Sequence, residues 1–158
     1  MRVNPAFNPA LDLMISRVIK APRSAVWNAW TVPASLEQWW IPVPSKCKVV
    51  ELDLQPGGAF VTQMSENGGE LAPHLSACFL AVDPLERLVF TNALLGGWRP
   101  AEQPFMTAII TFKEHALGTD YTAHVMHKSN ADRNQHEELG FYDGWGTVIE
   151  QLARLLES

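Results

Sequence analysis

Five histidines are the residues best suited to acid–base chemistry or metal binding near neutral pH. His124 and His127 lie three residues apart on an expected strand, so their side chains should point to opposite faces and cannot share a metal ion. His115 falls in an expected hairpin turn, His74 begins a strand, and His136 lies near the start of a helix. This spacing indicates no metal site, and we expect no cofactor.

Glu138 is the candidate for acid–base catalysis that the helix spacing offers. It lies four residues before Tyr142 and seven before Trp145, which places it above the apolar stripe of the expected C-terminal helix. A carboxylate held against Phe141 and Trp145 would be desolvated, which favours its protonated form and suits it to proton transfer. The alternative is that Glu137 and Glu138 are solvated and favour the positive end of the helix dipole.

Motifs for covalent catalysis or phosphate binding are absent from the sequence. G-x-S-x-G does not occur, and Cys47 and Cys78 have neither CxxC spacing nor a neighbouring histidine, which predicts free thiols. The glycine pairs at 57–58, 68–69 and 96–97 lack the spacing of phosphate-binding loops, and turns explain them. Covalent catalysis is therefore not expected.

The composition indicates an ordinary soluble globular protein. The chain has 158 residues, 47% hydrophobic and 18% charged, and its length fits a single domain over residues 1–158. A net charge of −5 with scattered Lys and Arg argues against nucleic-acid binding. Because no apolar run approaches the ~20 residues that span a bilayer, and residues 1–11 lack a signal-peptide pattern, we expect a cytoplasmic protein that does not enter a membrane.

Hydrophobic periodicity and turn residues predict the order of the elements. A first strand over residues 11–20 is followed by two short helices on either side of Thr31-Val32. The helical spacing of apolar residues after Gly140 predicts one long helix over residues 131–157. Between the helices, turns such as Pro56-Gly57-Gly58 separate six strands, over residues 47–54, 59–65, 75–82, 87–93, 106–112 and 120–126.

These elements predict an α+β fold with an internal cavity. One helix covers only part of a seven-stranded antiparallel sheet, so we expect a curved sheet that wraps around the C-terminal helix, with Trp145 buried between them. Strand parity assigns three sets of residues to the concave face: Phe60, Thr62 and Met64; Leu88, Phe90 and Asn92; and Met106, Ala108, Ile110 and Phe112.

The segment over residues 94–104 is an unusually long and apolar connection between two strands. It has glycines at 96–97 and prolines at 100 and 104. Leaving Leu94, Leu95 and Trp98 in water would create an exposed apolar patch. We therefore expect this segment to cover a mouth of the cavity or to pack on a second subunit.

Five segments in order along the chain resemble a known family. They are APRSAVWNAWTVPASLEQWWIP (21–42), PGGAF (56–60), DPLERLVFTN (83–92), the pair Gly118-Thr119, and HEELGFYDGWGTVIEQL (136–152). These segments resemble the activator of heat-shock-protein-90 ATPase homologue-like family, within the SRPBCC superfamily of START-like and Bet-v-1-like proteins. The resemblance implies a helix-grip fold with a cavity between sheet and helix. It does not fix an activity, because the superfamily includes lipid carriers, polyketide cyclases and a co-chaperone domain.

We predict that the cavity binds a small hydrophobic or aromatic molecule, because pockets of this composition are typical of such sites. One alternative is an acid–base enzyme similar to polyketide cyclases, in which Glu138 works with a tyrosine or histidine. A second alternative is a module that binds a chaperone or forms a homodimer through Trp98. The predicted ligand-binding residues are Phe60, Thr62, Met64, Phe90, Asn92, Trp98, Phe141 and Trp145.

Overall fold

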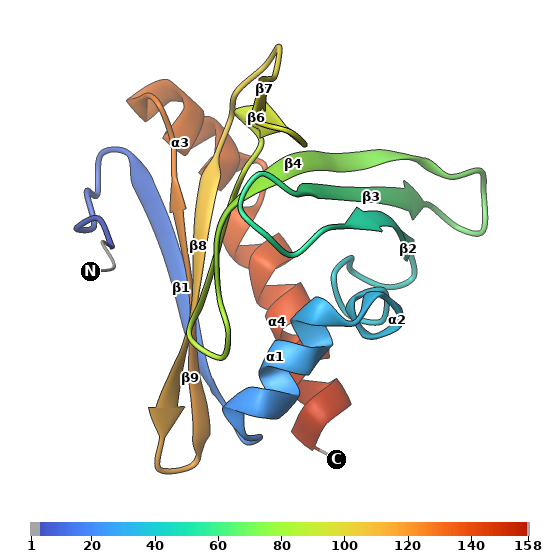
Figure 1. Ribbon diagram of the computed structural model, residues 1–158, viewed down its shortest axis with the longest axis vertical. Coiled ribbons are helices and arrows are strands. Elements are labelled where there is room, and N and C mark those ends of the chain that lie inside the picture. The colour runs from blue at the N-terminus through green and yellow to red at the C-terminus, as the bar shows by residue number, and fades with distance from the viewer. Residues whose placement is uncertain (1–3, 158) are drawn as a thin grey trace.

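A seven-stranded antiparallel sheet forms the body of the protein and confirms the predicted α+β fold (Figure 1). The computed structural model describes residues 4–157. The strands of this sheet are β1 Asp12–Ile19, β2 Lys46–Leu52, β3 Ala59–Ser65, β4 Ala72–Asp83, β5 Arg87–Thr91, β8 Thr107–His115 and β9 Gly118–Met126. They lie side by side in the order β1-β9-β8-β5-β4-β3-β2. Every hairpin therefore joins neighbouring strands, and β1 forms one edge of the sheet, next to β9.

Backbone irregularities bend one half of this sheet. In Figure 1, β2 and β3 run across the view, whereas β1, β8 and β9 run up and down it. Bulges increase twist and bend a strand. The register shifts all fall in the half formed by β2 to β5, at the residue pairs Val49/Glu51, Thr62/Gln63 and Phe79/Ala81.

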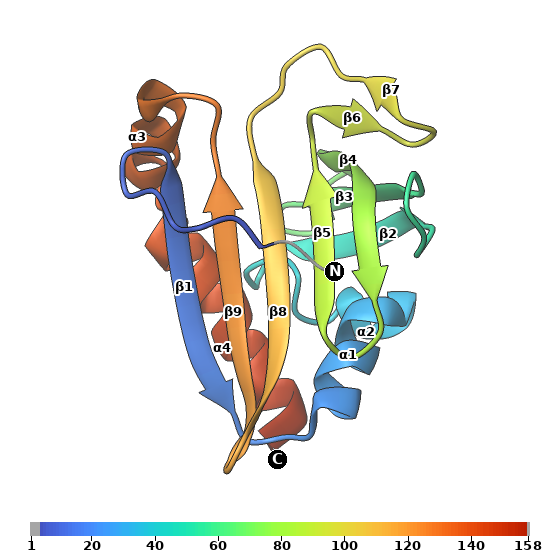
Figure 2. The same cartoon turned by 60° about the vertical axis from the view of Figure 1, so that its left-hand side comes forward.

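Helices pack inside the bend, as Figure 2 shows from a second direction. The helices are α1 Arg23–Thr31, α2 Pro33–Leu36, α3 Asn130–Glu138 and α4 Phe141–Glu157. The pair α1 and α2 confirms the two short helices predicted after the first strand. Between residues 4 and 157, no helix combines the length and the apolar character needed to cross a bilayer.

The prediction of one continuous helix over residues 131–157 is wrong, because α3 ends at Glu138 and α4 begins at Phe141. Gly140 lies between them with φ of 98°, in the left-handed region that favours glycine. A residue in this conformation ends a helix, and hydrophobic periodicity does not register it. The two helices also differ in character, since α3 buries none of its residues, whereas α4 buries Phe141, Val148, Ile149, Leu152 and Ala153.

An aromatic cluster fills the centre of the space between sheet and helices. Trp30 on α1 is 0% exposed, and its ring centroid lies 4.9–6.0 Å from those of Trp39, Trp40, Phe60 and Phe90. Its Nε1 donates a hydrogen bond of 2.9 Å to the hydroxyl of Tyr121. This cluster occupies much of the volume in which the sequence predicts a cavity.

Candidate functional site

A pocket of about 260 Å³ lies beyond the aromatic cluster, at the end of the molecule where α3 meets α4. Its walls come from both of these helices, from the start of β4, from the residue before β8, and from the loop after α2. The lining holds no Asp, Glu, Lys or Arg side chain; it consists of Trp40, Pro42, His74, Leu75, Met106, His136, Gly144, Trp145 and Val148.

Two tryptophans form the aromatic wall of this pocket. Trp145 on α4 stacks on Phe141 with 5.4 Å between ring centroids and meets the edge of Trp40 at 6.1 Å. Trp145 is partly buried rather than enclosed, because one side of its ring borders the pocket. The Nε1 of Trp40 is buried and has no hydrogen-bond acceptor among residues 4–157. An aromatic ligand would find rings to pack against here.

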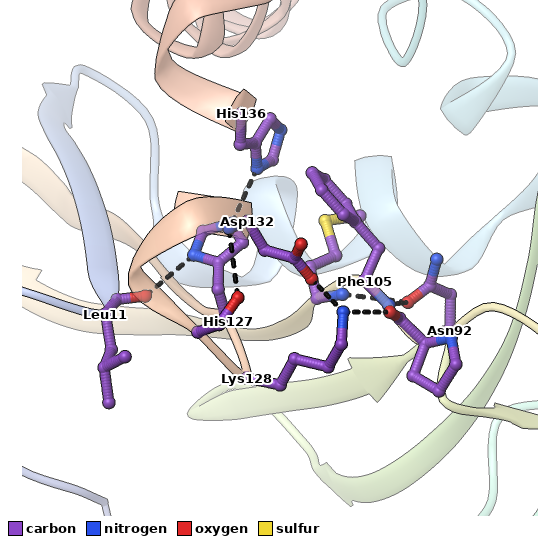
Figure 3. Close-up of polar contacts among 10 residues, drawn as sticks. Leu11, Asn92, Phe105, His127, Lys128, Asp132 and His136 are labelled. Atoms are coloured by element: carbon purple, nitrogen blue, oxygen red, sulfur yellow. Dashed lines mark hydrogen bonds and ion pairs between the residues drawn. The ribbon is translucent and has the colours of Figure 1, made fainter. Parts of the chain in front are cut away.

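His136, which is paired with His127, forms one polar side of the pocket. Nδ1 of His136 lies 2.8 Å from Nε2 of His127, and Nδ1 of His127 lies 2.8 Å from the carbonyl oxygen of Leu11 (Figure 3). The rings of Phe105 and Phe141 pack on His136 at 5.0 and 5.1 Å. Burial, and after it the neighbouring His127, lowers the pKa of His136 to about 4. The His136 ring is therefore neutral at pH 7.

The lowered pKa of His136 predicts a loss of stability in mild acid. The unfolded chain has the ordinary histidine pKa of about 6.5, so between this value and about 4 it binds more protons than the folded chain. The contribution is fully present above pH 6.5 and is lost as the pH falls toward 4. Between pH 7.5 and pH 5, we expect the free energy of urea unfolding to fall by about 1 kcal/mol more in the wild type than in His136→Phe. This value is below that of the full shift because the ring is only partly buried. Equal losses in the two proteins would contradict it.

His74 approaches the pocket from β4. Its Nδ1 lies 2.9 Å from the hydroxyl of Thr62, and burial lowers the pKa of His74. A bulge in β4 accompanies this contact, because Thr62 pairs with Leu75 and Gln63 pairs with Pro73, which leaves His74 on β4 unpaired between them. Thr62 is 1% exposed and positions His74; it does not itself line the pocket.

Asn92 shapes the pocket from outside the lining. Its Oδ1 accepts hydrogen bonds of 2.9 Å from the backbone N–H groups of Phe105 and Met106 (Figure 3). Met106 lines the pocket and Phe105 packs on His136, so this one amide fixes two neighbouring walls. Asn92 therefore acts through these residues, whereas the sequence predicted direct ligand contact.

Three of the predicted ligand-binding residues lie in the buried core and not in the lining of this pocket. Phe60 and Phe90 are 0% exposed and Phe141 is 1% exposed. Strand parity places Phe60 and Phe90 correctly on the concave face, but Trp40 packs on both rings and itself forms the pocket wall. Met64 is partly buried against the same core. Of the predicted ligand-binding residues, Trp145 is the one that lines the pocket.

Trp98 lies on the opposite face of the sheet. The residues around it form a small hairpin, β6 Leu94–Leu95 and β7 Arg99–Pro100, in which a Cβ added to Gly96 would lie 2.7 Å from the Cβ of Ala59. Ala59 alternates with Phe60 along β3 and therefore faces away from the core. The expected lid over the pocket is not formed by this segment. Contact with a second subunit stays a prediction, and Trp98 is 51% exposed.

Glu138 is exposed and does not reach the pocket. The break at Gly140 removes the helical register that linked Glu138 to Trp145, and it turns His136 toward the pocket instead. His136 was expected near the start of a helix and was not among the predicted ligand-binding residues. The signal that separates the two helices is Gly140, because glycine commonly follows the last residue of a helix.

Cys47 and Cys78 are free thiols, as predicted. Burial, followed by the charge of Glu37, raises the pKa of Cys47 to about 11, which makes it a poor nucleophile at neutral pH. In the part of the chain that the structure describes, no three His, Cys, Asp or Glu side chains are grouped so that they would hold a metal ion. The polar chemistry of the pocket therefore rests on its histidines.

Comparison with known proteins agrees with this architecture. Residues 20–157 match the model of the family described as Activator of Hsp90 ATPase homolog 1-like protein. The chain belongs to this family. None of the curated proteins matches it.

Several solved structures share the fold of this chain. NE0264 from Nitrosomonas europaea is 42% identical, with a TM-score of 0.87 over 96% of this chain and 97% of that chain. Ms6760 from Mycobacterium smegmatis is 28% identical, with a TM-score of 0.77 over 94% and 91%. CV1439 from Chromobacterium violaceum is 25% identical, with a TM-score of 0.73 over 93% and 98%. The helix-grip architecture predicted from the sequence is thus confirmed.

Proposed function

We propose that the protein binds a small hydrophobic or aromatic molecule in the pocket between α3, α4 and the bent sheet. The observation that carries this proposal is the pocket of about 260 Å³ walled by Trp40, Met106, Trp145 and Val148. Ligand sites in proteins are concave and mostly apolar, with a few polar groups that fix orientation. An apolar cavity of about 150 Å³ holds one benzene ring, so this pocket has room for a molecule of one or two rings.

Its position supports the same function. The superfamily that the sequence resembles includes carriers of hydrophobic molecules, and this pocket lies between sheet and C-terminal helix, where the resemblance implies a cavity. The absence of Asp, Glu, Lys and Arg from the lining favours a neutral ligand, because a buried charge without a partner is costly.

The acid–base enzyme is the weaker alternative. His136 is oriented by His127 in the way that a catalytic base is oriented by a second group. However, efficient general bases have a pKa near the working pH, and the pKa of His136 is about 4. Glu138, the other candidate, is exposed. These two observations support binding over proton transfer.

Filling the pocket should abolish binding while the fold is retained. Gly144 lines the pocket, and a Cβ at this position would meet no atom within 4 Å, so the side chain of Gly144→Leu has room to enter it. Leucine also favours the helix over glycine, so we expect no loss of stability. The probe is 2-methoxynaphthalene, and its binding is measured by the NMR shifts of the indole N–H signals of Trp40 and Trp145.

We expect these two indole signals to shift in the wild type and to remain still in Gly144→Leu, with at least a tenfold loss of affinity. The matched control is Thr147→Leu, which adds the same side chain at an exposed position of α4. Binding that survives in Gly144→Leu, or no binding of the probe by the wild type, would refute the proposal.

A further inference from the structure

We propose that the pocket selects neutral aromatic molecules that carry a hydroxyl group, and that this hydroxyl donates a hydrogen bond to Nε2 of His136. The inference rests on the proposed binding function and names the class of ligand. It follows from the chain of hydrogen bonds that runs from Leu11 through His127 to His136 (Figure 3).

The direction of this chain is fixed at its far end. The Leu11 carbonyl oxygen can only accept, so Nδ1 of His127 carries a hydrogen and donates to it. When both rings are neutral, each has one nitrogen that donates and one that accepts, so Nε2 of His127 is then an acceptor. Nδ1 of His136 must then donate to it at 2.8 Å. The same rule leaves Nε2 of His136 without a hydrogen, as an acceptor.

The free nitrogen is available to a ligand. Among residues 4–157, Nε2 of His136 has no hydrogen-bond partner. It is also not fully buried, because the buried side-chain atoms without a partner are Nε1 of Trp40 and Nε of Arg133. Figure 3 shows it on the side of the ring away from His127. His136 lines the pocket, so an accessible nitrogen on this side of the ring is within reach of a bound molecule.

The surroundings strengthen a hydrogen bond at this atom. Phe105 and Phe141 pack on the ring at 5.0 and 5.1 Å, and Trp145 lies at 6.5 Å. A hydrogen bond is stronger in such an apolar environment than in water, and an unpaired polar group is more costly there. The pocket lining contains one other titratable side chain, His74, and no Asp, Glu, Lys or Arg, so it offers an ionic ligand no opposite charge.

The shape of the site adds the aromatic requirement. Trp40 and Trp145 both line the pocket and meet edge to face at 6.1 Å, whereas the acceptor His136 comes from α3. A flat ring packed on the tryptophans would carry its hydroxyl at the periphery, in the plane of the ring. An aromatic molecule with a hydroxyl group can therefore pack on the tryptophans and donate a hydrogen bond to His136 at the same time.

The experiment compares two ligands that differ by one methyl group. 2-Naphthol and 2-methoxynaphthalene have the same rings, but only the first donates a hydrogen bond. Calorimetric titrations at pH 7.5, where ordinary imidazoles are mostly neutral, give both affinities for the wild type and for His136→Phe. His115→Phe, which changes an exposed histidine at the end of β8, is the matched control.

We expect the wild type and His115→Phe to bind 2-naphthol roughly fivefold more tightly than 2-methoxynaphthalene, as one net hydrogen bond implies. His136→Phe should bind the two ligands alike, and its unchanged affinity for 2-methoxynaphthalene would show that its pocket is intact. Equal binding of both ligands by the wild type would overturn this inference and leave the proposed function standing. If neither ligand binds, both proposals fail.

A second measurement tests the same bond without mutation. Long-range ¹H–¹⁵N spectra of the histidine side chains distinguish a protonated from an unprotonated ring nitrogen. We expect Nε2 of His136 to be unprotonated in the free protein, and its signal to move when 2-naphthol is added but not when 2-methoxynaphthalene is added. A hydrogen on Nε2 in the free protein would overturn the inference.

Discussion

Replacing Trp30 with alanine is expected to destabilise the protein by about 3–5 kcal/mol. Trp30 is 0% exposed and lies at the centre of the aromatic cluster, so its removal leaves a large cavity that the surrounding rings cannot fill. It also removes the hydrogen-bond partner of the buried Tyr121 hydroxyl. Urea unfolding at pH 7 measures the loss directly.

Trp145→Ala provides the comparison, because it deletes the same side chain from the edge of the pocket. Trp145 is only partly buried, and part of its ring already borders open space, so we expect a smaller loss of about 1–2 kcal/mol. Equal losses at Trp30 and Trp145 would contradict the division of the tryptophans into core and pocket wall.

The order of the elements was predictable because each one has a local signal. The β2–β3 hairpin follows from the turn residues Pro56-Gly57-Gly58 between two alternating segments, and the split between α1 and α2 follows from Pro33. Once seven strands with short connections are joined to an amphipathic helix, few arrangements bury the apolar faces. The sheet order follows from these local signals.

The pocket was less predictable because its position depends on which residues pack over the concave face of the sheet. Hydrophobic periodicity gives no information about this packing. Alternation along β3 and β5 assigns Phe60 and Phe90 to the concave face, and this is correct. The alternation does not show that Trp40, which follows the short helices, packs over both of these rings and forms the pocket wall in their place. A face is a property of one strand, whereas a pocket wall depends on what packs on top of it.

Two backbone irregularities decide which histidines face the pocket. The bulge beside Thr62 places His74 there, and Gly140 ends α3 so that His136 turns inward while Glu138 remains exposed. Each shifts the register of a side chain relative to a regular strand or helix. A bulge has no strong sequence signal. A glycine is a signal for a helix end, but the continuous hydrophobic spacing across Gly140 favoured a single helix in the prediction.

Asp12 binds His124, a histidine outside the pocket lining, and replacing Asp12 should destabilise the protein. Oδ2 of Asp12 accepts hydrogen bonds of 2.9 Å from Nε2 of His124 and from the backbone N–H of Asn8, and both side chains are almost fully buried. Asp12→Ala leaves both donors without this acceptor, and each lost partner costs about 1–3 kcal/mol. We expect Asp12→Ala to lose about 2–4 kcal/mol in urea unfolding at pH 7.

Asp12→Asn tests whether the lost hydrogen bonds cause this destabilisation. The asparagine keeps one oxygen acceptor of similar geometry in the same space, so we expect a loss of about half that of Asp12→Ala. In His124→Phe the carboxylate loses one of its two donors, and adding Asp12→Ala to this variant should cost less than it does in the wild type, because the two side chains act as one unit. Additive losses would show that Asp12 and His124 stabilise the β1–β9 edge independently.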